Sequence, residues 1–411
     1  MQMAFNEAGE YVPTPPHECT DCGICLSVCP FASVPAGRGE SPLGQPIASY
    51  VGHMVEEERW RAAASGGLTT GLLAAALREE MVDAIVAVVP TGDPAALFKA
   101  AVLESPEQVF ASAKSKYYPV EFSQVLRQIE ASERRYAIVA LPCVVRALRL
   151  AQESFGWLRE RLRFILSLTC GQSKSKLYTS FLLHLAGTAP EKVGSVDYRA
   201  APATTANDFV FQAVDRDGRA GRPLPFWSGP VGAVWTGFFF SLGACFYCED
   251  LFGEYADISI MDAWLPDYIQ DTRGHSIVCV RNRELHELLR RMQERAEVAL
   301  EPIAEETVLA SQQVALRIKS ERLGPRLAKL ERRGVTVPTA RVRPEARRVS
   351  VHDWQLRCHQ KLSRLLVRGS GLRFLIGCWA LRVAVSCGWG LLTRARRILG
   401  VMLRRLRRSE R

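Results

Sequence analysis

One cysteine run constrains this chain more than any other stretch of its sequence. Between Cys19 and Pro30 the chain reads C-x2-C-x2-C-x3-C-P, which makes Cys19, Cys22, Cys25 and Cys29 the candidate ligands. This spacing is typical of the ferredoxin-type loop that binds a [4Fe–4S] cluster, whereas zinc sites usually separate two C-x2-C pairs by a long spacer. The run therefore predicts an iron–sulfur cluster, with a zinc site as the alternative.

The rest of the composition favours metal ligation over disulfide bonds. The chain has 411 residues and 12 cysteines, and its segment Met1–Pro16 has neither the basic stretch nor the apolar run of a secretory signal. Cysteines in a chain without such a signal are more often metal ligands than a disulfide framework. We therefore expect the protein to work in a reducing cytoplasm.

The length and the shifts in composition predict three units. Residues 1–46 are rich in proline and glycine and form the ferredoxin-like 4Fe–4S segment. Residues 47–316 form the core, and residues 317–411 form a helical basic tail.

The central unit alternates short apolar runs with stretches of helical periodicity. The apolar runs predict buried strands at 84–89, 136–141 and 164–169, and the periodic stretches predict helices at 68–77, 122–129, 144–150 and 175–186. This alternation is typical of an α/β fold with a parallel sheet.

Two stretches of the core have the character of a phosphate site. Ser65-Gly66-Gly67 precedes a predicted helix, so that Ser65 would cap the helix and its free N–H groups would bind a phosphate or pyrophosphate. Further along, Lys114 and Lys116 flank a serine and precede Tyr117, which suits phosphate contact beside a ring that stacks on a cofactor. The alternatives are a plain capped helix and a solvated basic turn.

Four further cysteines predict a second metal site. Cys143 and Cys170 each follow a predicted strand, and therefore lie at the edge where open α/β sheets bind ligands. Cys245 and Cys248 form a C-x2-C pair in an aromatic setting. These four thiols favour a second [4Fe–4S] cluster, with zinc as the rival. The partition of the eight cysteines between two clusters stays open, and Cys279, within a predicted strand, is interpreted as a packing residue.

The positive charge of the chain is concentrated at its C-terminal end. The net charge is +10, but residues 341–411 carry about +15, which leaves about −5 on the rest. Within 391–408, apolar and arginine side chains fall on opposite faces of a predicted helix, which is typical of binding to an anionic membrane surface. The alternatives are packing on a partner subunit and a disordered tail, and we expect no nucleic-acid partner. The apolar stretch 372–392 contains two arginines, which disfavours a membrane span.

Taken in order, these pieces resemble the coenzyme F420 hydrogenase/dehydrogenase beta-subunit family, which also includes chlorophyllide vinyl and hydroxymethyl-chlorophyll reductases. The matching pieces are the cysteine run, Ala64–Thr70, Ser115–Tyr117 with Pro119, Leu141–Cys143, Cys170, Cys245–Asp250 and Ala256–Ser259. The resemblance implies a mixed α/β flavin-binding core that carries FAD and one or more [4Fe–4S] clusters. It also implies that Ser65, Gly66, Gly67 and Thr69 contact the flavin, that Lys114, Lys116 and Tyr117 lie beside it, and that the later cysteines hold a cluster nearby.

These parts predict an oxidoreductase. A flavin exchanges electrons in pairs and an iron–sulfur cluster exchanges them singly, so a protein with both couples a one-electron carrier of the ferredoxin type to a two-electron substrate. The substrate would be a small molecule such as coenzyme F420 or a pyrrole-type ring. The alternatives are a non-catalytic electron-transfer subunit of a larger complex and a zinc-stabilised scaffold. We expect the protein to be cytoplasmic, with a tail that can bind the inner face of the membrane.

Overall fold

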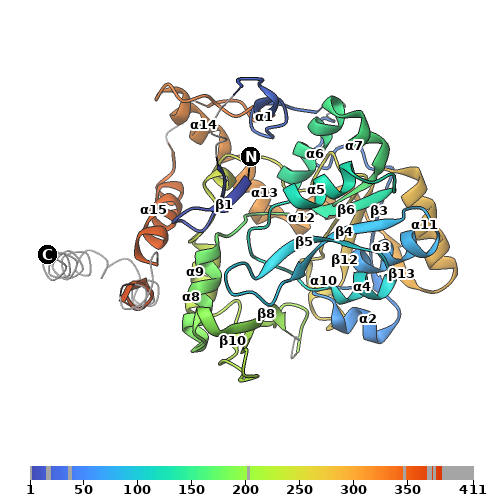
Figure 1. Cartoon of the computed structure of the whole chain (residues 1–411), viewed down its shortest axis with the longest axis horizontal. Helices are drawn as coiled ribbons and strands as arrows, with labels where there is room; N and C mark the ends of the chain where they lie inside the picture. The colour runs from blue at the N-terminus through green and yellow to red at the C-terminus, as the bar shows by residue number, and fades with distance from the viewer. Residues whose placement is uncertain are drawn as a thin grey trace, which may run out of the picture.

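The structure is a computed structural model, and it describes residues 2–14, 20–35, 39–200, 204–345, 349–367, 373 and 376–381. The centre of the molecule is an eight-stranded mixed sheet (Figure 1). Its strands lie in the order β13 (Val298–Pro302), β3 (Ala48–Met54), β12 (Ser276–Val280), β11 (Ile258–Asp262), β7 (Leu162–Leu168), β6 (Tyr136–Ala140), β4 (Ala84–Pro90) and β5 (Phe98–Leu103).

The middle of the sheet is parallel, as the alternation of strands and helices predicted. Strand β4 pairs in parallel with β6, β6 with β7, and β7 with β11. The flanking strands β5, β12 and β13 pair antiparallel with their neighbours, so the sheet as a whole is mixed. Because the four parallel strands point the same way, the segments that follow them lie at one edge, where α/β sheets bind ligands.

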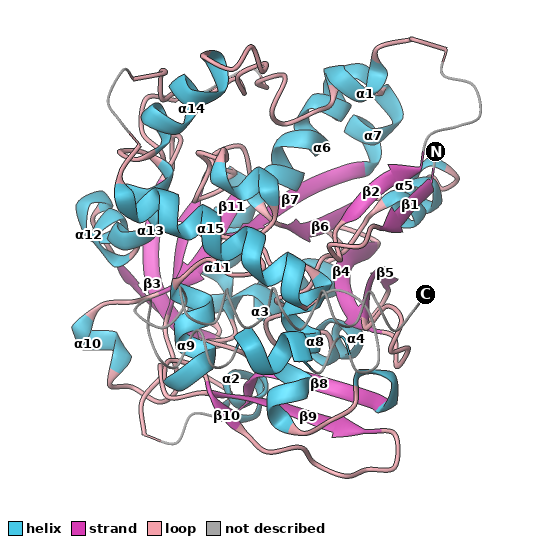
Figure 2. Cartoon of the chain, turned by 90° about the vertical axis from the view of Figure 1, so that its left-hand side faces the viewer, coloured by secondary structure: helices cyan, strands magenta, loops and turns pink. Residues whose placement is uncertain are grey.

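Helices cover both faces of this sheet (Figure 2), and two clusters of buried hydrophobic side chains fill the interfaces. One face is covered by α3 (Leu68–Arg78), α4 (Pro106–Ala111) and α11 (Arg283–Glu294), and the other by α5 (Ser123–Glu130), α6 (Pro142–Ser154) and α7 (Gly156–Arg161). Successive residues of β4 alternate between the clusters: Ile85 and Ala87 face the first, and Ala84 and Val86 face the second. A strand buried on both sides reads as a continuous apolar run, which is why these strands were recognisable from sequence.

A smaller antiparallel sheet follows β7. It consists of β8 (Val193–Ala200), β9 (Val210–Asp215) and β10 (Leu224–Pro225), and it packs against α8 (Lys176–Ala186) and α9 (Gly229–Thr236). Buried aromatic rings dominate this interface, among them Tyr178, Phe181, Tyr198 and Phe240. This unit places the stretch that carries Cys245 and Cys248 beside the carboxyl edge of the main sheet.

Both ends of the described chain pack against the core. The hairpin of β1 (Gln2–Phe5) and β2 (Tyr11–Thr14) brings Phe5 into edge contact with Tyr118, and α1 (Ile24–Ser27) follows within the cysteine run. The C-terminal helices are α12 (Glu305–Ser311), α13 (Gln313–Lys319), α14 (Leu323–Glu331) and α15 (Val351–Leu366). Helix α13 crosses the predicted boundary between residues 316 and 317, and the division into three units stays a prediction.

Helix α15 packs along the stretch that precedes the later cysteines. The Ser363 hydroxyl accepts a hydrogen bond from Phe240 N–H at 2.8 Å, and Gln360 donates to the Ser241 carbonyl at 2.6 Å. Arg326 of α14 and Asp353 of α15 form an ion pair at 2.5 Å with both side chains buried. This part of the predicted tail is therefore joined to the core.

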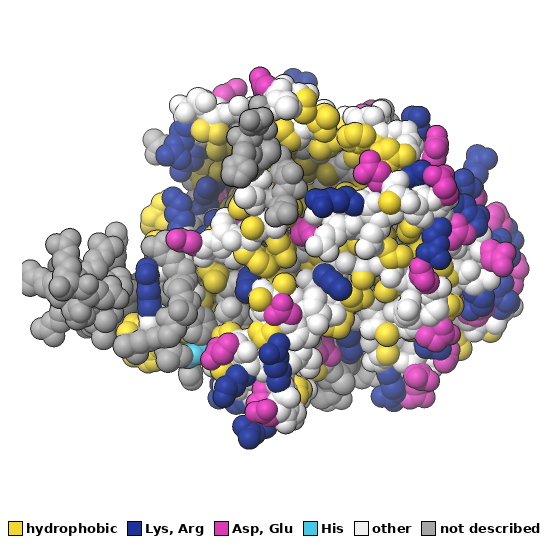
Figure 3. Space-filling model, in the orientation of Figure 1, with side chains coloured by type: hydrophobic (Ala, Val, Ile, Leu, Met, Phe, Trp, Pro, Cys, Tyr) yellow, Lys and Arg dark blue, Asp and Glu magenta, His cyan; other side chains and the backbone are white. Residues whose placement is uncertain are grey.

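The core carries charged side chains of both signs at its surface. Acidic and basic side chains are interspersed over the core on the face shown in Figure 3. The predicted basic amphipathic helix at 391–408 lies outside the described residues. Among the residues that are described, no helix has the length and apolar character that a membrane crossing requires.

Candidate functional site

Three segments bring the four later cysteines to the carboxyl edge of the parallel strands. Cys143 lies in the first turn of α6 directly after β6, and Cys170 follows β7. Cys245 lies in the short 3-10 helix η2 (Gly243–Phe246), and Cys248 comes just after it. The loops are tied together by backbone hydrogen bonds from Cys170 N–H to the Leu251 carbonyl at 2.9 Å and from Leu242 N–H to the Ser173 carbonyl at 3.0 Å.

The four thiols affect one another electrostatically. Burial raises the pKa of Cys143, and the neighbouring thiols of Cys248, Cys170 and Cys245 raise it further. Burial likewise raises the pKa of Cys170 to about 12 and raises the pKa of Cys245. The raised pKa values of Cys143, Cys170 and Cys245 disfavour their thiolate forms, so holding these sulfurs as thiolates requires a cationic centre to balance their charge.

One buried lysine lies against this group. Lys319, at the end of α13, is only 3% exposed, and its ammonium donates to the carbonyls of Asp250 at 3.0 Å and Cys248 at 3.5 Å. Burial opposes its charge, but attraction to the sulfurs of Cys248, Cys170 and Cys245 in their thiolate form outweighs that cost and raises the pKa of Lys319 above its ordinary value. A permanent positive charge beside the four sulfurs suits a centre that carries net negative charge.

The Cys245 sulfur also has a hydrogen-bond donor. The backbone N–H of Ser173 points at Cys245 Sγ at 3.3 Å. Donors to ligand sulfur are among the means by which a protein sets the potential of an iron–sulfur cluster. Within the described part of the chain, no three Cys, His, Asp or Glu side chains are arranged to hold a single metal ion. The donor set, four cysteines with a hydrogen-bonded sulfur, fits a cluster.

The N-terminal cysteine run has a different setting. Cys22 and Cys25 are exposed and Cys29 is half-buried, whereas Cys19 lies outside the described residues. Gly23 adopts a left-handed conformation with a φ of 73° and starts α1. A hydrogen bond from the Ile24 backbone lowers the pKa of the exposed Cys22 thiol. The chain thus presents the described thiols of this run at the surface on one tight turn.

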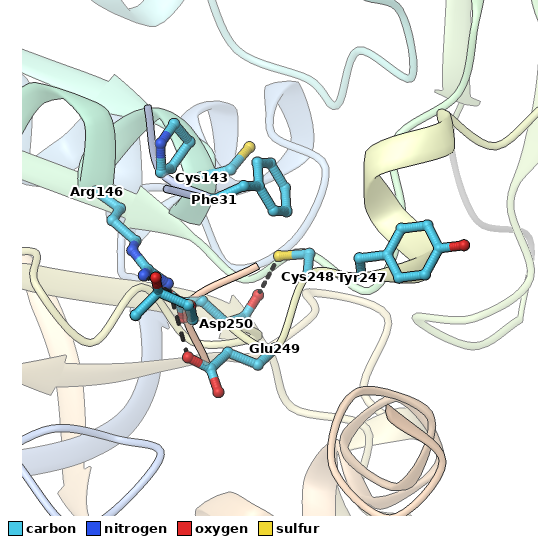
Figure 4. Close-up of a pocket in the computed structure, with 9 residues that line it drawn as sticks. Phe31, Cys143, Arg146, Tyr247, Cys248, Glu249 and Asp250 are labelled. Carbon is cyan, nitrogen blue, oxygen red and sulfur yellow. Dashed lines mark hydrogen bonds and ion pairs between the residues drawn. The ribbon is translucent and has the colours of Figure 1, made fainter. Parts of the chain in front are cut away.

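The segment that follows the N-terminal cysteines borders a small pocket together with two of the later cysteines (Figure 4). The lining combines Pro30 and Phe31, directly after Cys29, with Cys143 and Cys248. Arg146, Tyr247, Glu249, Asp250 and Thr339 complete the lining. The sequence predicted both sets of cysteines, but it did not predict that Pro30 and Phe31 lie beside the later set.

The structure corrects one local prediction about the Ser65–Thr69 stretch. Ser65 does not cap α3: the capping residue is Gly67, with a φ of 79°, and the Ser65 hydroxyl donates to the His275 carbonyl at 3.0 Å. The sequence places two glycines side by side, and only the second can begin the helix in a left-handed conformation. The first, Gly66, is closely packed, because an added Cβ would lie 2.8 Å from the Gly52 carbonyl oxygen.

Lys114, Ser115 and Lys116 border a cavity of about 150 Å³, which is also lined by Pro90 at the end of β4 and by residues 194–197 of β8. Lys114 lies 3.6 Å from the Asp197 carboxylate, and Lys116 donates to the carbonyls of Ser112 and Ala113. Burial lowers the pKa of Lys116 to about 8. Residues 65–69 do not line this cavity. The two stretches that the sequence predicts to bind phosphate therefore do not meet there.

Tyr117 lies in an aromatic cluster. Close to this cluster is an ion pair that the sequence did not predict. The Tyr117 ring centroid is 4.6 Å from that of Trp235, and burial raises the pKa of Tyr117. Nearby, Arg199 is buried and pairs with Asp262 at 2.9 Å. Asp262 ends β11, so its place at the carboxyl edge was predictable, whereas Arg199 and Lys319 had no local motif that marked them.

The comparisons with known proteins agree with this arrangement. The description "Coenzyme F420 hydrogenase/dehydrogenase, beta subunit N-term" matches residues 49–127, and the corresponding C-terminus description matches residues 133–306. The matched ranges include Cys143, Cys170, Cys245 and Cys248, but not the N-terminal cysteine run or Lys319.

Two individual proteins are similar to this chain. An uncharacterised protein of Methanocaldococcus jannaschii is 26% identical over 234 residues, which cover 57% of this chain and 79% of that protein. A chain in the structure of the F420-reducing [NiFe] hydrogenase complex from Methanosarcina barkeri superimposes with a TM-score of 0.56 at 17% identity, covering 73% of this chain and 99% of that one. The second likeness supports the fold. Because the two family matches together span more than half of the sequence, this chain belongs to the coenzyme F420 hydrogenase/dehydrogenase beta-subunit family.

Proposed function

We propose that this protein is a flavin- and iron–sulfur-dependent oxidoreductase that couples one-electron carriers of the ferredoxin type to a two-electron reaction of a small molecule. The observation that carries the proposal is the pocket at which Pro30 and Phe31 adjoin Cys143 and Cys248. A relay of single electrons needs two centres close to each other. The pocket supports such a relay because Pro30 and Phe31, directly after the first predicted set of ligands, lie beside two predicted ligands of the second.

In this proposal Cys19, Cys22, Cys25 and Cys29 hold the first [4Fe–4S] cluster, and Cys143, Cys170, Cys245 and Cys248 hold the second. The clusters would supply one-electron exchange, and the bound FAD would supply hydride chemistry. The protein's own residues hold and adjust the second site. Lys319 balances negative charge from the buried side, and the Ser173 N–H orients the Cys245 sulfur.

The flavin would bind through the residues that the family resemblance implies, which are Ser65, Gly66, Gly67, Thr69, Lys114, Lys116 and Tyr117. Gly67 begins α3 without a side-chain cap, which leaves the first-turn N–H groups open to a phosphate. Lys116 is largely charged below pH 8 and lies on the 150 Å³ cavity, where it would meet an anionic group. The Tyr117 ring, beside Trp235, would exclude water from the flavin.

The proposal also covers the substrate class and the location of the protein. The relative in the Methanosarcina complex is named for coenzyme F420, and we propose F420 or a pyrrole-type ring as the substrate class. The basic C-terminal tail would attach the protein to an anionic membrane surface or to a partner subunit from the cytoplasmic side.

Purification without oxygen tests the proposal directly. Iron, acid-labile sulfide and flavin are measured per chain, and the visible spectrum is recorded before and after reduction. The proposal expects iron and sulfide equivalent to two clusters, and about one FAD per chain. Zinc without sulfide would instead support the scaffold alternative.

One alternative is supported by a specific observation. Gly66 is closed in by Gly52, His53 and Gly274, and the Lys116 ammonium is bonded within its own loop. If these contacts persist in solution, the protein would bind clusters without flavin, as a non-catalytic electron-transfer subunit of a larger complex. Two clusters per chain with no flavin, even after incubation with excess FAD, would decide for that alternative.

A further inference from the structure

One arginine contacts all three segments that meet between the two cysteine sets. Arg146 lies one helical turn after Cys143 in α6 and is only 5% exposed. Its guanidinium donates to the Ser33 carbonyl at 3.1 and 2.8 Å and to the Thr339 carbonyl at 3.0 Å. It also lies 3.6 Å from the carboxylate of Glu249, the residue after Cys248.

A segment from the C-terminal third of the chain completes the connection. We name residues 335–345 the strap. Within it, Thr339 donates from its N–H to the Phe31 carbonyl at 2.9 Å and from its hydroxyl to the Ala32 carbonyl at 3.0 Å. Arg341 donates to the Gly39 carbonyl at 2.9 Å and pairs with Glu254 at 2.6 Å. The strap therefore joins the N-terminal segment to the loop that carries Cys248.

The chemistry of these contacts explains why the central residue is an arginine. A buried guanidinium is tolerated only when its donors are satisfied and its charge is balanced. Carbonyl oxygens from two distant segments satisfy the donors, and Glu249 supplies the charge. A lysine offers a compact ammonium without the planar fork that reaches both segments at once. Figure 4 shows Arg146 between Cys143 and Glu249, beside Phe31.

We propose that Arg146 is a positioning residue that fixes the N-terminal iron–sulfur segment over the second cysteine site, with the strap and Glu249 as its partners. This inference rests on the two clusters of the proposed function. Electron exchange between the two clusters would move one electron from a reduced cluster to an oxidised one. It needs no proton and no further reactant. Electron exchange weakens steeply with separation, so a segment held in one place keeps the exchange fast.

The test uses the full chain, purified without oxygen with its clusters, and the variant Arg146→Met. Iron and sulfide content are measured first. The magnetic interaction between the two clusters is then recorded by electron paramagnetic resonance of the fully reduced protein. We expect cluster content to be unchanged and the interaction to be lost, leaving the spectra of two isolated clusters.

Arg149→Met is the matched control. Arg149 lies on the same helix, and its guanidinium donates to the Tyr255 carbonyl and pairs with Asp257, away from the strap. This variant should lower thermal stability yet keep the magnetic interaction. An unchanged interaction in Arg146→Met would overturn the proposal, and so would equal losses in both variants.

A second variant applies if Arg146→Met loses a cluster, and a second measurement applies if the wild-type protein holds fewer than two clusters. If Arg146→Met loses a cluster, Thr339→Pro decides by the same criteria, because it removes both hydrogen bonds from Thr339 to Phe31 and Ala32. If the wild-type protein holds fewer than two clusters, the proposed function fails. Amide hydrogen exchange at residues 31–33 still tests whether Arg146 holds the N-terminal segment in place. The exchange should become about tenfold faster in Arg146→Met but not in Arg149→Met. Equal exchange rates would contradict the role of Arg146.

Discussion

The two cysteine sets differ in how the chain brings their members together. The N-terminal set lies in one short run, and its local shape depends on a single turn at Gly23 with Cys22 and Cys25 exposed. The later set comes from the ends of β6 and β7 and from a loop after the second sheet, and its thiols are half-buried beside Lys319. The comparison shows that one site is local to the sequence, whereas the other is a product of the fold.

This difference has energetic consequences. A site that assembles from distant segments gains or loses its ligands together with the tertiary structure, so its metal and the folded core stabilise each other. A site on one exposed turn can lose its ligands while the core stays folded. Five predictions rest on this contrast, and each would either sharpen it or break it.

The largest expected effect comes from removing a ligand at each site. Cys245→Ser should lose the second cluster, about four iron atoms, and lower the thermal stability of the core. Cys22→Ser should lose a similar amount of iron from the first cluster with little change in core stability. Iron analysis and circular dichroism melting measure both quantities. Cys279→Ser, in the packed strand β12, is the control and should keep all the iron. Equal losses of stability in the two ligand variants would break the comparison.

Thiol reactivity in cluster-free protein should differ by more than a hundredfold between the sites, because the thiolate is the reactive form. The pKa of Cys22 is lowered and its thiol is exposed, whereas burial raises the pKa of Cys170 to about 12. At pH 7.5 iodoacetamide should label Cys22 quickly and Cys170 hardly at all, as read by peptide mass spectrometry.

The raised pKa of Cys170 also predicts how labelling and protein stability change with pH. The labelling of Cys170 should rise about tenfold per pH unit up to about pH 12. Since the folded state holds this proton more tightly than the unfolded state, the cluster-free protein should lose stability as the pH rises above about 9. Fast labelling of Cys170 at pH 7.5 would show that the later thiols are not shielded.

Two glycines with the same backbone conformation should respond differently to alanine. Gly23 and Gly253 have φ values of 73° and 69°, but a Cβ at Gly23 meets nothing within 4 Å, whereas one at Gly253 would lie 2.1 Å from Ser167 Oγ. Gly23→Ala should cost about 1 kcal/mol of strain, and Gly253→Ala about 3 kcal/mol or more, since overpacking adds to the strain. Chemical denaturation measures both. Similar costs would indicate that the loop after Cys248 relaxes as freely as the N-terminal turn.

The smallest expected effect is on the potential of the second cluster. Lys319→Met removes a buried positive charge and should lower the midpoint potential by about 60 mV, a tenfold change in the reduced fraction at fixed poise. The N-terminal cluster should keep its potential. A redox titration followed by electron paramagnetic resonance resolves the two. Lys329→Met, an exposed lysine on the neighbouring helix α14, is the control. A parallel shift of both clusters would contradict a local role for Lys319.

Much of the core could be predicted because its strands are buried on both faces. The apolar runs at 84–89, 136–141 and 164–169 correspond to β4, β6 and β7, and their alternation with helices predicted the parallel pairing that the structure shows. Strand β12 lies within a predicted strand and is buried along its whole length. The antiparallel strands β5 and β13 and the small aromatic sheet were less evident, because short strands with one packed face leave a weaker pattern. The capping of α3 was assigned to Ser65, but the left-handed turn at Gly67 decides where that helix begins.

The sequence by itself determined which residues are able to ligate iron and that two of them end parallel strands. Ligand type and short spacing are local properties, and a parallel sheet brings the ends of its strands to one edge. Only the tertiary structure decided that Lys319 lies beside the later thiols, that Arg146 joins Ser33 to Thr339, and that Phe31 shares a pocket with Cys143 and Cys248. These contacts join residues far apart in the chain, and no local pattern encodes them because packing of the whole core creates them.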